Sequence, residues 1–187
     1  YNNSSFSGYL IDPGYPESRA YVVKVMMEIV NKYDVDGIVM DDYFYAYGGT
    51  TSEDAKAQAK HYNPSDVIDV NGNGNTLDDW RRSNVDKVIK ATYDSIQAVK
   101  PWVRFGMGPG GIWTIDNGAA RAYGIKLPAG ITGGDIYNNL YCNTVEWVKG
   151  GYVDYVNPQI YWSTQVAAQD FDVLCEWWAK SVCEHFS

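Results

Sequence analysis

Residues 35–45 read VDGIVMDDYFY, an apolar run that ends in two carboxylates and three aromatic side chains. The β-branched residues after Gly37 favour a buried strand over a helix. Two-residue alternation places Asp41 on one face of this strand and Asp42 on the other. Because a charged pair at the end of a buried strand is costly unless it is used or neutralised, we predict a functional site here, with Asp41 facing the interior of a parallel sheet or barrel. In the purely structural alternative, Asp42 caps the next loop and Asp41 pairs with an arginine.

The composition is that of a single acidic domain. The 187 residues are 45% hydrophobic, which is enough for one substantial core. A formal net charge of -8 argues against nucleic acid as a partner, because phosphate binding needs clustered lysine and arginine. Tyrosine (16 residues) and tryptophan (7 residues) are abundant, and such rings suit the apolar faces of sugars. We expect no membrane span, since no apolar run is long enough for one.

Strand and helix patterns alternate along the chain. Strands are predicted at 9–12, within 35–45, at 103–109 and at 153–162, and helices at 16–33, 80–99, 135–149 and 168–183. The polar segment 46–79 is too long for an ordinary connection and is predicted to be an insertion. Alternating strands and helices imply a parallel sheet whose ligand site lies at the carboxyl ends of the strands. The residues that fall at those ends are Asp12, Asp41, Asp42, Pro109, Tyr161 and Trp162.

Polar and aromatic residues extend this predicted site. Asn157, Gln159 and Tyr161 share one face of the last strand, where a core strand would carry valine or isoleucine. Aromatic rings stack on sugars, although each ring in question is equally well explained as part of the core. The predicted substrate-binding residues are Asp12, Tyr43, Tyr45, Trp113, Asn157, Gln159, Tyr161 and Trp162.

Residues 69–79 read DVNGNGNTLDD and have features of a calcium-binding loop. Oxygen-bearing side chains on alternate residues around a glycine turn fit the hard oxygen ligands that Ca²⁺ requires. Trp80 stands where an EF-hand has its closing glutamate, so Asp78 or Asp79 would have to close the loop. We predict a structural Ca²⁺ site, and no cofactor for catalysis; the alternative is a series of Asn-Gly turns without an ion. The predicted ligands are Asp69, Asn71, Asn73, Asn75, Asp78 and Asp79.

Cysteines and arginines provide weaker signals. Cys142, Cys175 and Cys183 have no zinc-ligand spacing, and the last two lie too far apart along one predicted helix for a disulfide. All three are predicted to be small core residues. Arg81 and Arg82 are interpreted as a helix-start feature, with one of them pairing with an acid of the site.

Four long segments carry a resemblance to a known family: IDPGYPESRAYV, YDVDGIVMDDYFY, DDWRRSNVDKVIKATYDSIQAVKPWVRFGMGPGGIW and GGYVDYVNPQIYW. They resemble glycosyl-hydrolase-like family 10, a bacterial domain long catalogued as one of unknown function. The resemblance spans nearly the whole chain and implies a TIM-type (β/α)₈ barrel, hydrolysis of bacterial glycans such as cell-wall polymers, and an exported or lipid-anchored protein. The stretch GMGPGGIW departs from the Ser-Pro-Phe-Gly pattern that family members more often carry.

The predicted strands are too few for a whole barrel of that kind. They resemble its third to sixth strands, and a typical barrel takes about 250 residues. The chain also begins at Tyr1, without Met or a signal peptide, so we expect a processed, trimmed or incomplete product. We therefore predict a partial barrel, completed by missing strands or another chain, unless a shorter closed arrangement forms. A half barrel exposes sheet edges and should associate.

Two glycosidase mechanisms fit adjacent acids. In the first, a carboxylate is the nucleophile and its acid partner lies about 5 Å away on another strand. In the second, by analogy with hexosaminidases, the 2-acetamido group of the sugar attacks, Asp41 orients this group, and Asp42 is acid and base. Tyr161 and Asn157 would then bond the acetamido carbonyl, and the adjacent charge would raise one pKa, as an acid requires.

Two other classes of function compete with a glycosidase. A non-catalytic carbohydrate-binding or scaffold protein on a degenerate barrel would keep the aromatic residues without needing both acids. A Mg²⁺ site for lyase or phosphoryl chemistry would use the paired carboxylates, but no phosphate-cradling Gly-Lys-Ser/Thr loop accompanies them.

Overall fold

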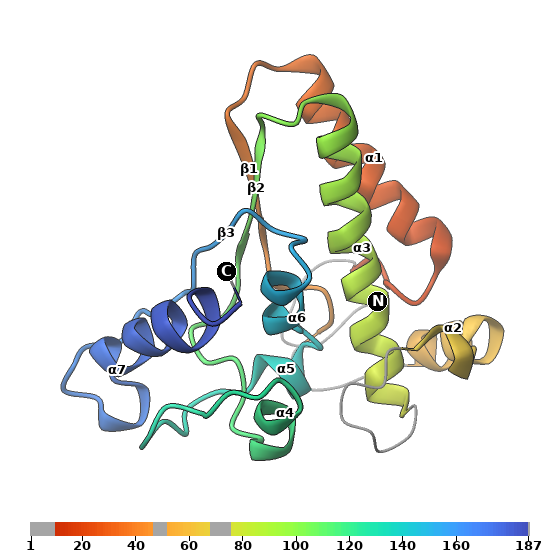
Figure 1. Cartoon of the computed structure of the whole chain (residues 1–187). Helices are drawn as coiled ribbons and strands as arrows, with labels where there is room; N and C mark the ends of the chain where they lie inside the picture. Colours follow the sequence, from red (N-terminus) through yellow and green to blue (C-terminus); the bar gives the residue numbers. More distant parts are fainter. Residues whose placement is uncertain (1–9, 47–51, 68–75, 187) are drawn as a thin grey trace.

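A computed structural model describes residues 10–46, 52–67 and 76–186 (Figure 1). The structure is mixed α/β, with a small parallel sheet of three strands in the order β1-β2-β3. These strands are β1 (Gly37–Asp41), β2 (Arg104–Gly108) and β3 (Tyr155–Val156). In the register of the sheet, Val39 lies opposite Gly106, and Met107 lies opposite Val156.

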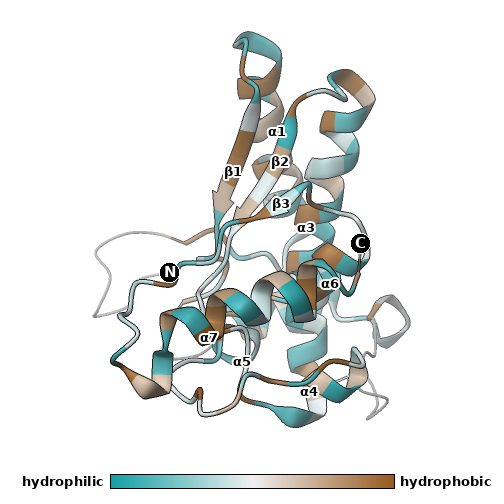
Figure 2. Cartoon of the chain, turned by 60° about the vertical axis from the view of Figure 1, so that its left-hand side comes forward, coloured by the Kyte–Doolittle hydropathy of each residue, from teal (hydrophilic) through white to brown (hydrophobic). Residues whose placement is uncertain are grey.

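Helices cover one side of this sheet. The helical segments are α1 (Pro16–Lys32), α2 (Ser52–His61), η1 (Pro64–Asp66), α3 (Leu77–Val99), α4 (Asn117–Ala122), α5 (Ile136–Asn139), α6 (Thr144–Lys149), η2 (Ala167–Gln169), α7 (Phe171–Glu176) and η3 (Trp177–Cys183). Figure 1 shows the sheet nearly edge-on, with α1, α3 and α6 on the same side of it. In Figure 2, α7 passes in front of the lower part of the molecule, below the carboxyl ends of the strands. None of the described helices is long and apolar enough to cross a membrane.

The two faces of the sheet differ sharply in burial. Phe105 and Met107 point into the main hydrophobic core and are fully buried. On the other face, the Val39 side chain is 56% exposed and Tyr155 is 43% exposed. The Tyr155 ring lies over Gly106, where an added Cβ would come within 2.2 Å of the ring. One face of the sheet is therefore core, and the other is largely open.

The two long helices begin where their sequences provide a start signal. Pro16 opens α1, and Glu17 lies in its first turn, where a negative charge favours the helix dipole. Thr76 caps α3: its hydroxyl accepts a hydrogen bond from the backbone N–H of Asp79, and Asp79 bonds the backbone N–H of Thr76 in return. This capping box places the start of α3 at Leu77, earlier than the predicted start at Trp80.

Two predicted strands are shorter than expected. Within the predicted strand 9–12, residues 10–12 form no strand, and residue 9 lies outside the described residues. The predicted strand 153–162 is reduced to β3, followed by an isolated bridge between Gly110 and Gln159. The backbone N–H groups of Asn157 and Gln159 still donate to the carbonyls of Met107 and Pro109, so this segment stays hydrogen-bonded to the chain at the end of β2. Pro158 has no N–H to offer a strand on the opposite side.

Two predicted helices are also broken. The predicted helix 135–149 consists of α5 and α6, separated by a turn in which Tyr141 has φ of 59°. The predicted helix 168–183 is a succession of η2, α7 and the π-helical η3. The predicted insertion contains α2 and η1, and the glycine-rich stretch after β2 contains α4.

The cysteines are only partly core residues. Cys142 is fully buried, whereas Cys175 and Cys183 are half-buried, and all three are free thiols. The prediction that all three belong to the core therefore holds for Cys142 alone.

A buried carboxyl group lies between α3 and α6. Asp86 of α3 is 6% exposed, and its Oδ1 accepts a hydrogen bond of 2.6 Å from Nε1 of Trp147 in α6. Burial raises the pKa of Asp86 to about 8, opposed by the Trp147 hydrogen bond and reinforced by Glu146. Because the folded-state pKa lies above the unfolded value, Asp86 stabilises the fold fully below about pH 4 and progressively less up to about pH 8.

We predict that Asp86→Asn flattens this pH dependence. Asparagine keeps an oxygen for Trp147 but carries no charge to desolvate, so the variant should be more stable than wild type at pH 8, with the difference shrinking toward pH 4. Urea unfolding across this pH range measures the effect. Asp94→Asn, on the exposed side of the same helix, is the matched control; an Asp86→Asn profile parallel to wild type would contradict the prediction.

Candidate functional site

The carboxyl ends of β1 and β2 meet at Asp42. Its side chain is 2% exposed, and its Oδ2 accepts a hydrogen bond of 2.5 Å from the backbone N–H of Gly110. Its backbone carbonyl accepts hydrogen bonds from the Phe44 N–H at 2.9 Å and from Cys142 Sγ at 3.1 Å. Asp42 is thus fixed by its own turn and by two chain segments that are distant in sequence, around Gly110 and Cys142.

The surroundings of Asp42 favour its protonated form. Burial, helped by the neighbouring charge of Asp41 and opposed by the hydrogen bond from Gly110, raises the pKa of the carboxyl group to about 6. About half of the Asp42 carboxyl groups therefore carry a proton near pH 6, where an ordinary aspartate is almost fully ionised. A carboxyl group in this state can act as a general acid.

Asp41 has the opposite environment. Its side chain is exposed, on the open face of the sheet with Val39, as expected for two residues that are two positions apart on one strand. Its Oδ1 accepts hydrogen bonds from Gln159 Nε2 at 2.6 Å and from the backbone N–H of Asp42 at 2.9 Å. Gln159 also donates to the Gly108 carbonyl at 2.7 Å and accepts from the Tyr161 hydroxyl at 3.0 Å. A short polar chain therefore fixes Asp41 from the segment after β3.

Asp42 lines a cavity of about 350 Å³, which we call the Asp42 cavity. Its lining includes Tyr43, Gly110, Ile136, Asn139, Gln159 and Trp162. Of the described residues that line it, Asp42 and Asp135 are carboxylates and none is lysine or arginine. The cavity is thus suited to an uncharged, hydroxyl-rich ligand.

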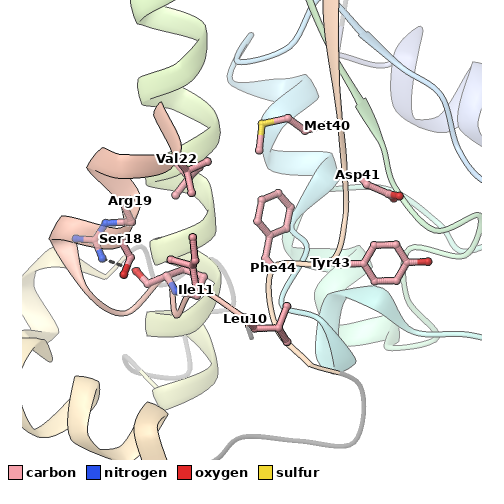
Figure 3. A pocket seen from close by; sticks show the side chains of 11 residues that line it. Leu10, Ile11, Ser18, Arg19, Val22, Met40, Asp41, Tyr43 and Phe44 are labelled. Carbon is pink, nitrogen blue, oxygen red and sulfur yellow. Dashed lines mark hydrogen bonds between the residues drawn. The ribbon is translucent and has the colours of Figure 1, made fainter. Parts of the chain in front are cut away.

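A second cavity, of about 300 Å³, lies beside β1 and is lined by residues from both faces of the strand end, Met40, Asp41, Tyr43 and Phe44, together with residues of α1; we call it the edge cavity (Figure 3). Figure 3 shows Met40 and Phe44 directed toward the helices, whereas Asp41 and Tyr43 point the opposite way. The edge cavity is mostly apolar, and Arg19 in its wall is already engaged: Nη1 donates to the Pro13 carbonyl at 2.6 Å. Its chemistry resembles an uncovered part of the core more than a sugar site.

The predicted sugar-binding residues are not all brought together. Tyr43, Gln159, Tyr161 and Trp162 line the Asp42 cavity, and the Tyr161 side chain is 80% exposed. Asp12 is half-buried outside the lining, with its Oδ1 accepting from the Gly14 N–H. Asn157 is exposed but does not line the cavity either.

Two predicted stacking residues lie in the core instead. Trp113 is 1% exposed and packs against Tyr123, Tyr137 and Trp177. Tyr45 is 8% exposed and packs edge-on against Tyr141. Neither ring offers a face to a sugar, because aromatic clusters bury both of them. For these residues the core interpretation is the correct one.

The predicted calcium ligands fall mostly outside the described residues. This applies to Asp69, Asn71, Asn73 and Asn75. Asp78 and Asp79 lie in the first turn of α3, where they pair with Arg81 and Arg82 respectively. Within the described ranges, no group of three or more His, Cys, Asp or Glu side chains could hold a metal ion. The calcium site stays a prediction.

Several residues that line the Asp42 cavity were not predicted from the sequence. Gly110 supplies the N–H that binds Asp42, and Asp135, Ile136 and Asn139 form a wall from the segment around α5. Asp135 caps α5 by accepting from the Asn138 N–H, so its sequence signal was that of a helix start. A polar side chain at a cap gives no further sequence clue that it borders a cavity.

The sequence matches the family described as Glycosyl hydrolase-like 10 over residues 2–186. The chain belongs to this family. This confirms the resemblance carried by the four segments.

Individual relatives agree with this assignment. The chain is 41% identical over 172 residues to "Glycosyl hydrolase YngK" of Bacillus subtilis, covering 91% of this chain and 31% of that protein. It is 34% identical over 175 residues to "Glycosyl hydrolase DigH" of Escherichia coli K12, covering 93% of this chain and 36% of that protein. This glycosyl hydrolase-like 10 chain therefore spans about a third of the length of these curated relatives.

We predict that Gly110→Ala disrupts the Asp42 cavity. An added Cβ would lie 2.6 Å from Cγ2 of Ile136 and 3.3 Å from Oδ2 of Asp42, so the wall must shift. We expect a loss of about 1–3 kcal/mol in the free energy of unfolding, measured by urea titration. At Gly108 the nearest atom to an added Cβ lies at 3.7 Å, so Gly108→Ala is the matched control. Equal stability of the two variants would show that Gly110 is not closely packed.

Proposed function

We propose that this chain forms the catalytic part of a glycoside hydrolase, with its active site at the carboxyl ends of β1 and β2. The observation that carries the proposal is the contrast between two adjacent acids: Asp42 is buried and has a pKa raised to about 6, while Asp41 is exposed and hydrogen-bonded. Glycosidases need one carboxyl group that is protonated and another that is ionised at the same pH. The relatives YngK and DigH, both named glycosyl hydrolases, support the same class of reaction.

In the proposed mechanism, Asp42 is the acid and base. Protonated Asp42 donates its proton to the oxygen of the leaving sugar, and then accepts a proton from the attacking water. The Gly110 N–H binds Oδ2 and stabilises the carboxylate formed in the first step. The exposed rings of Tyr43 and Tyr161 are the proposed stacking surface for the sugar.

Asp41 has a positioning role in this proposal. It orients the 2-acetamido group of the sugar, whose carbonyl oxygen attacks the anomeric carbon, and Gln159 fixes the carboxylate. Tyr161 contributes its ring rather than its hydroxyl, because the hydroxyl donates to Gln159. The substrate class that follows is a glycan containing N-acetylhexosamine, of the kind found in bacterial cell walls, which implies action outside the cytoplasm.

A conventional nucleophile is the second candidate mechanism. Asp135 is the other carboxylate in the lining of the Asp42 cavity. Its Oδ1 accepts from the Asn138 backbone N–H at 3.0 Å, and its Oδ2 accepts from Asn138 Nδ2 at 2.9 Å. Because both oxygens are engaged, Asp135 is a weaker nucleophile than a free carboxylate, and we favour substrate assistance. A non-catalytic sugar-binding role would leave the raised pKa of Asp42 without a use.

We further propose that the chain is part of a (β/α)₈ barrel completed by the rest of a longer parent protein. Two features support this: the open face of the sheet around Val39, and the apolar edge cavity beside β1 (Figure 3). In a closed barrel, the open face would become the barrel interior, and a neighbouring strand and helix would cover the edge cavity. A structural Ca²⁺ in the loop before α3 is a separate proposal, based on its sequence.

We predict that Asp42→Asn in the full-length parent abolishes hydrolysis and leaves folding intact, because asparagine cannot transfer the proton. In wild type, the rate should fall as pH rises through about 6, since only protonated Asp42 is active as the acid. Hydrolysis is measured by the mass of the products released from one bacterial cell-wall polymer and from the de-N-acetylated form of the same polymer. Cleavage of only the acetylated polymer supports the proposed role of Asp41, whereas equal cleavage of both polymers supports a conventional nucleophile. Full activity in Asp42→Asn would contradict the assignment of Asp42 as the acid and base.

Barrel closure predicts a different effect for Val39→Lys. In a closed barrel, residue 39 faces the interior, and a buried lysine should lower the free energy of unfolding of the full-length parent by about 2 kcal/mol or more. Val99→Lys is the matched control, because the two valines are 56% and 50% exposed in this chain. Equal stability of both variants in urea titration would argue against closure around Val39.

A further inference from the structure

Two consecutive arginines at the start of α3 are buried. Arg81 and Arg82 are each 6% exposed. Arg81 binds Asp54 through two hydrogen bonds, Nη2 to Oδ2 at 2.7 Å and Nε to Oδ1 at 3.2 Å. Arg82 pairs with Asp79 at 2.7 Å. Since a buried charge is tolerated only when it is paired, these carboxylates fix both guanidinium groups in place.

Each guanidinium group contacts one end of the segment around α5. The Arg82 group lies 4.1 Å from the centre of the Tyr137 ring, and its Nη1 donates to the Tyr137 carbonyl at 3.3 Å. Arg81 Nη1 donates to the Tyr141 hydroxyl, also at 3.3 Å. Tyr137 lies within α5, and Tyr141 lies just after it. The two arginines therefore hold this segment at two points.

The segment around α5 is also the wall of the Asp42 cavity. Asp135, Ile136 and Asn139 line the cavity, and Sγ of Cys142 donates to the Asp42 carbonyl. A helix of only four residues has little intrinsic stability. The left-handed conformation of Tyr141, with φ of 59°, adds backbone strain. The position of this wall must therefore come from its tertiary contacts.

We propose that Arg81 and Arg82 are positioning residues, which hold the segment 135–142 against Asp42 and so determine both the fit of the sugar and the exclusion of water from the acid. The inference rests on the proposed function, because it assigns the wall to sugar binding. It also links the insertion to the site. Asp54, the main partner of Arg81, lies in α2, so this helix supports the wall from a distance through Arg81 and Tyr141.

Arg81→Lys in the full-length parent tests the proposal. Lysine keeps the positive charge for Asp54 but cannot bind Asp54 and Tyr141 through one rigid plane. Tyr141→Phe is the second variant: it keeps the buried ring and removes only the hydroxyl that Arg81 binds. Arg104→Lys is the matched control, since Arg104 pairs with Asp154 at the opposite end of β2 and its side chain is 70% exposed.

Two readouts separate positioning from a merely structural role. The first is the titration of Asp42, followed by carbon NMR of labelled aspartate and assigned with Asp42→Asn. In wild type, the groups that act on the Asp42 carboxyl group are the Asp41 carboxylate and the Gly110 N–H, while the Cys142 thiol bonds the Asp42 backbone carbonyl, and the midpoint should be about 6. A loosened wall admits water, so we expect the midpoint to fall by about one pH unit in Arg81→Lys and by less in Tyr141→Phe. The second readout is KM, which should rise about tenfold in Arg81→Lys, whereas kcat should change less.

The outcomes are distinct. The positioning role is supported if Arg81→Lys and Tyr141→Phe both lower the titration midpoint of Asp42 and raise KM. The control Arg104→Lys should match wild type in both quantities. If the parent shows no hydrolysis, the proposed function fails, and the titration of Asp42 still decides whether the wall is held by the arginines. If Arg81→Lys does not fold, Tyr141→Phe decides alone. Folded variants that titrate like wild type, even with reduced thermal stability, would overturn the proposal.

Discussion

The desolvation of one carboxyl group sets the main constraint on this structure. Asp42 is removed from water at the end of β1, and its Oδ2 is bound by the backbone N–H of Gly110. That contact requires β2 to end beside β1, and it leaves no room for a side chain at residue 110, where Ile136 packs. A charged form of Asp42 is disfavoured in such a place, so the arrangement that shapes the cavity also sets the chemistry of the acid.

The buried polar face of α3 supports the same region of the structure. This helix buries charged side chains along its first turns, including Asp79, Arg81, Arg82 and Asp86. Buried ion pairs are weak contributors to stability relative to apolar packing, and they are better suited to fixing orientation. Here they connect the insertion, the turn after α5 and the cavity wall. In addition to covering the sheet, α3 therefore holds the wall of the proposed site in position.

Sequence patterns predicted the parts of the fold that depend on local chemistry. The strand at 37–41, the long helices α1 and α3, and the opposite environments of Asp41 and Asp42 all follow from periodicity and alternation. The sequence could not distinguish Trp113 in an aromatic cluster from a ring beside a ligand, because burial depends on tertiary neighbours. It likewise missed Gly110 and the break at Tyr141, since a backbone donor and a left-handed non-glycine residue leave no residue-type signal.

The alternation of β1 has a consequence for how this chain can change during evolution. Asp41 is exposed to solvent and its neighbour Asp42 is buried only because β1 pairs with β2 in a single register. Deleting or adding one residue within β1 would exchange the two environments, whereas the segment between β1 and α3 already holds an additional helix without altering that register. Length variation should therefore accumulate in the connections of this family, while the length of the strand stays fixed.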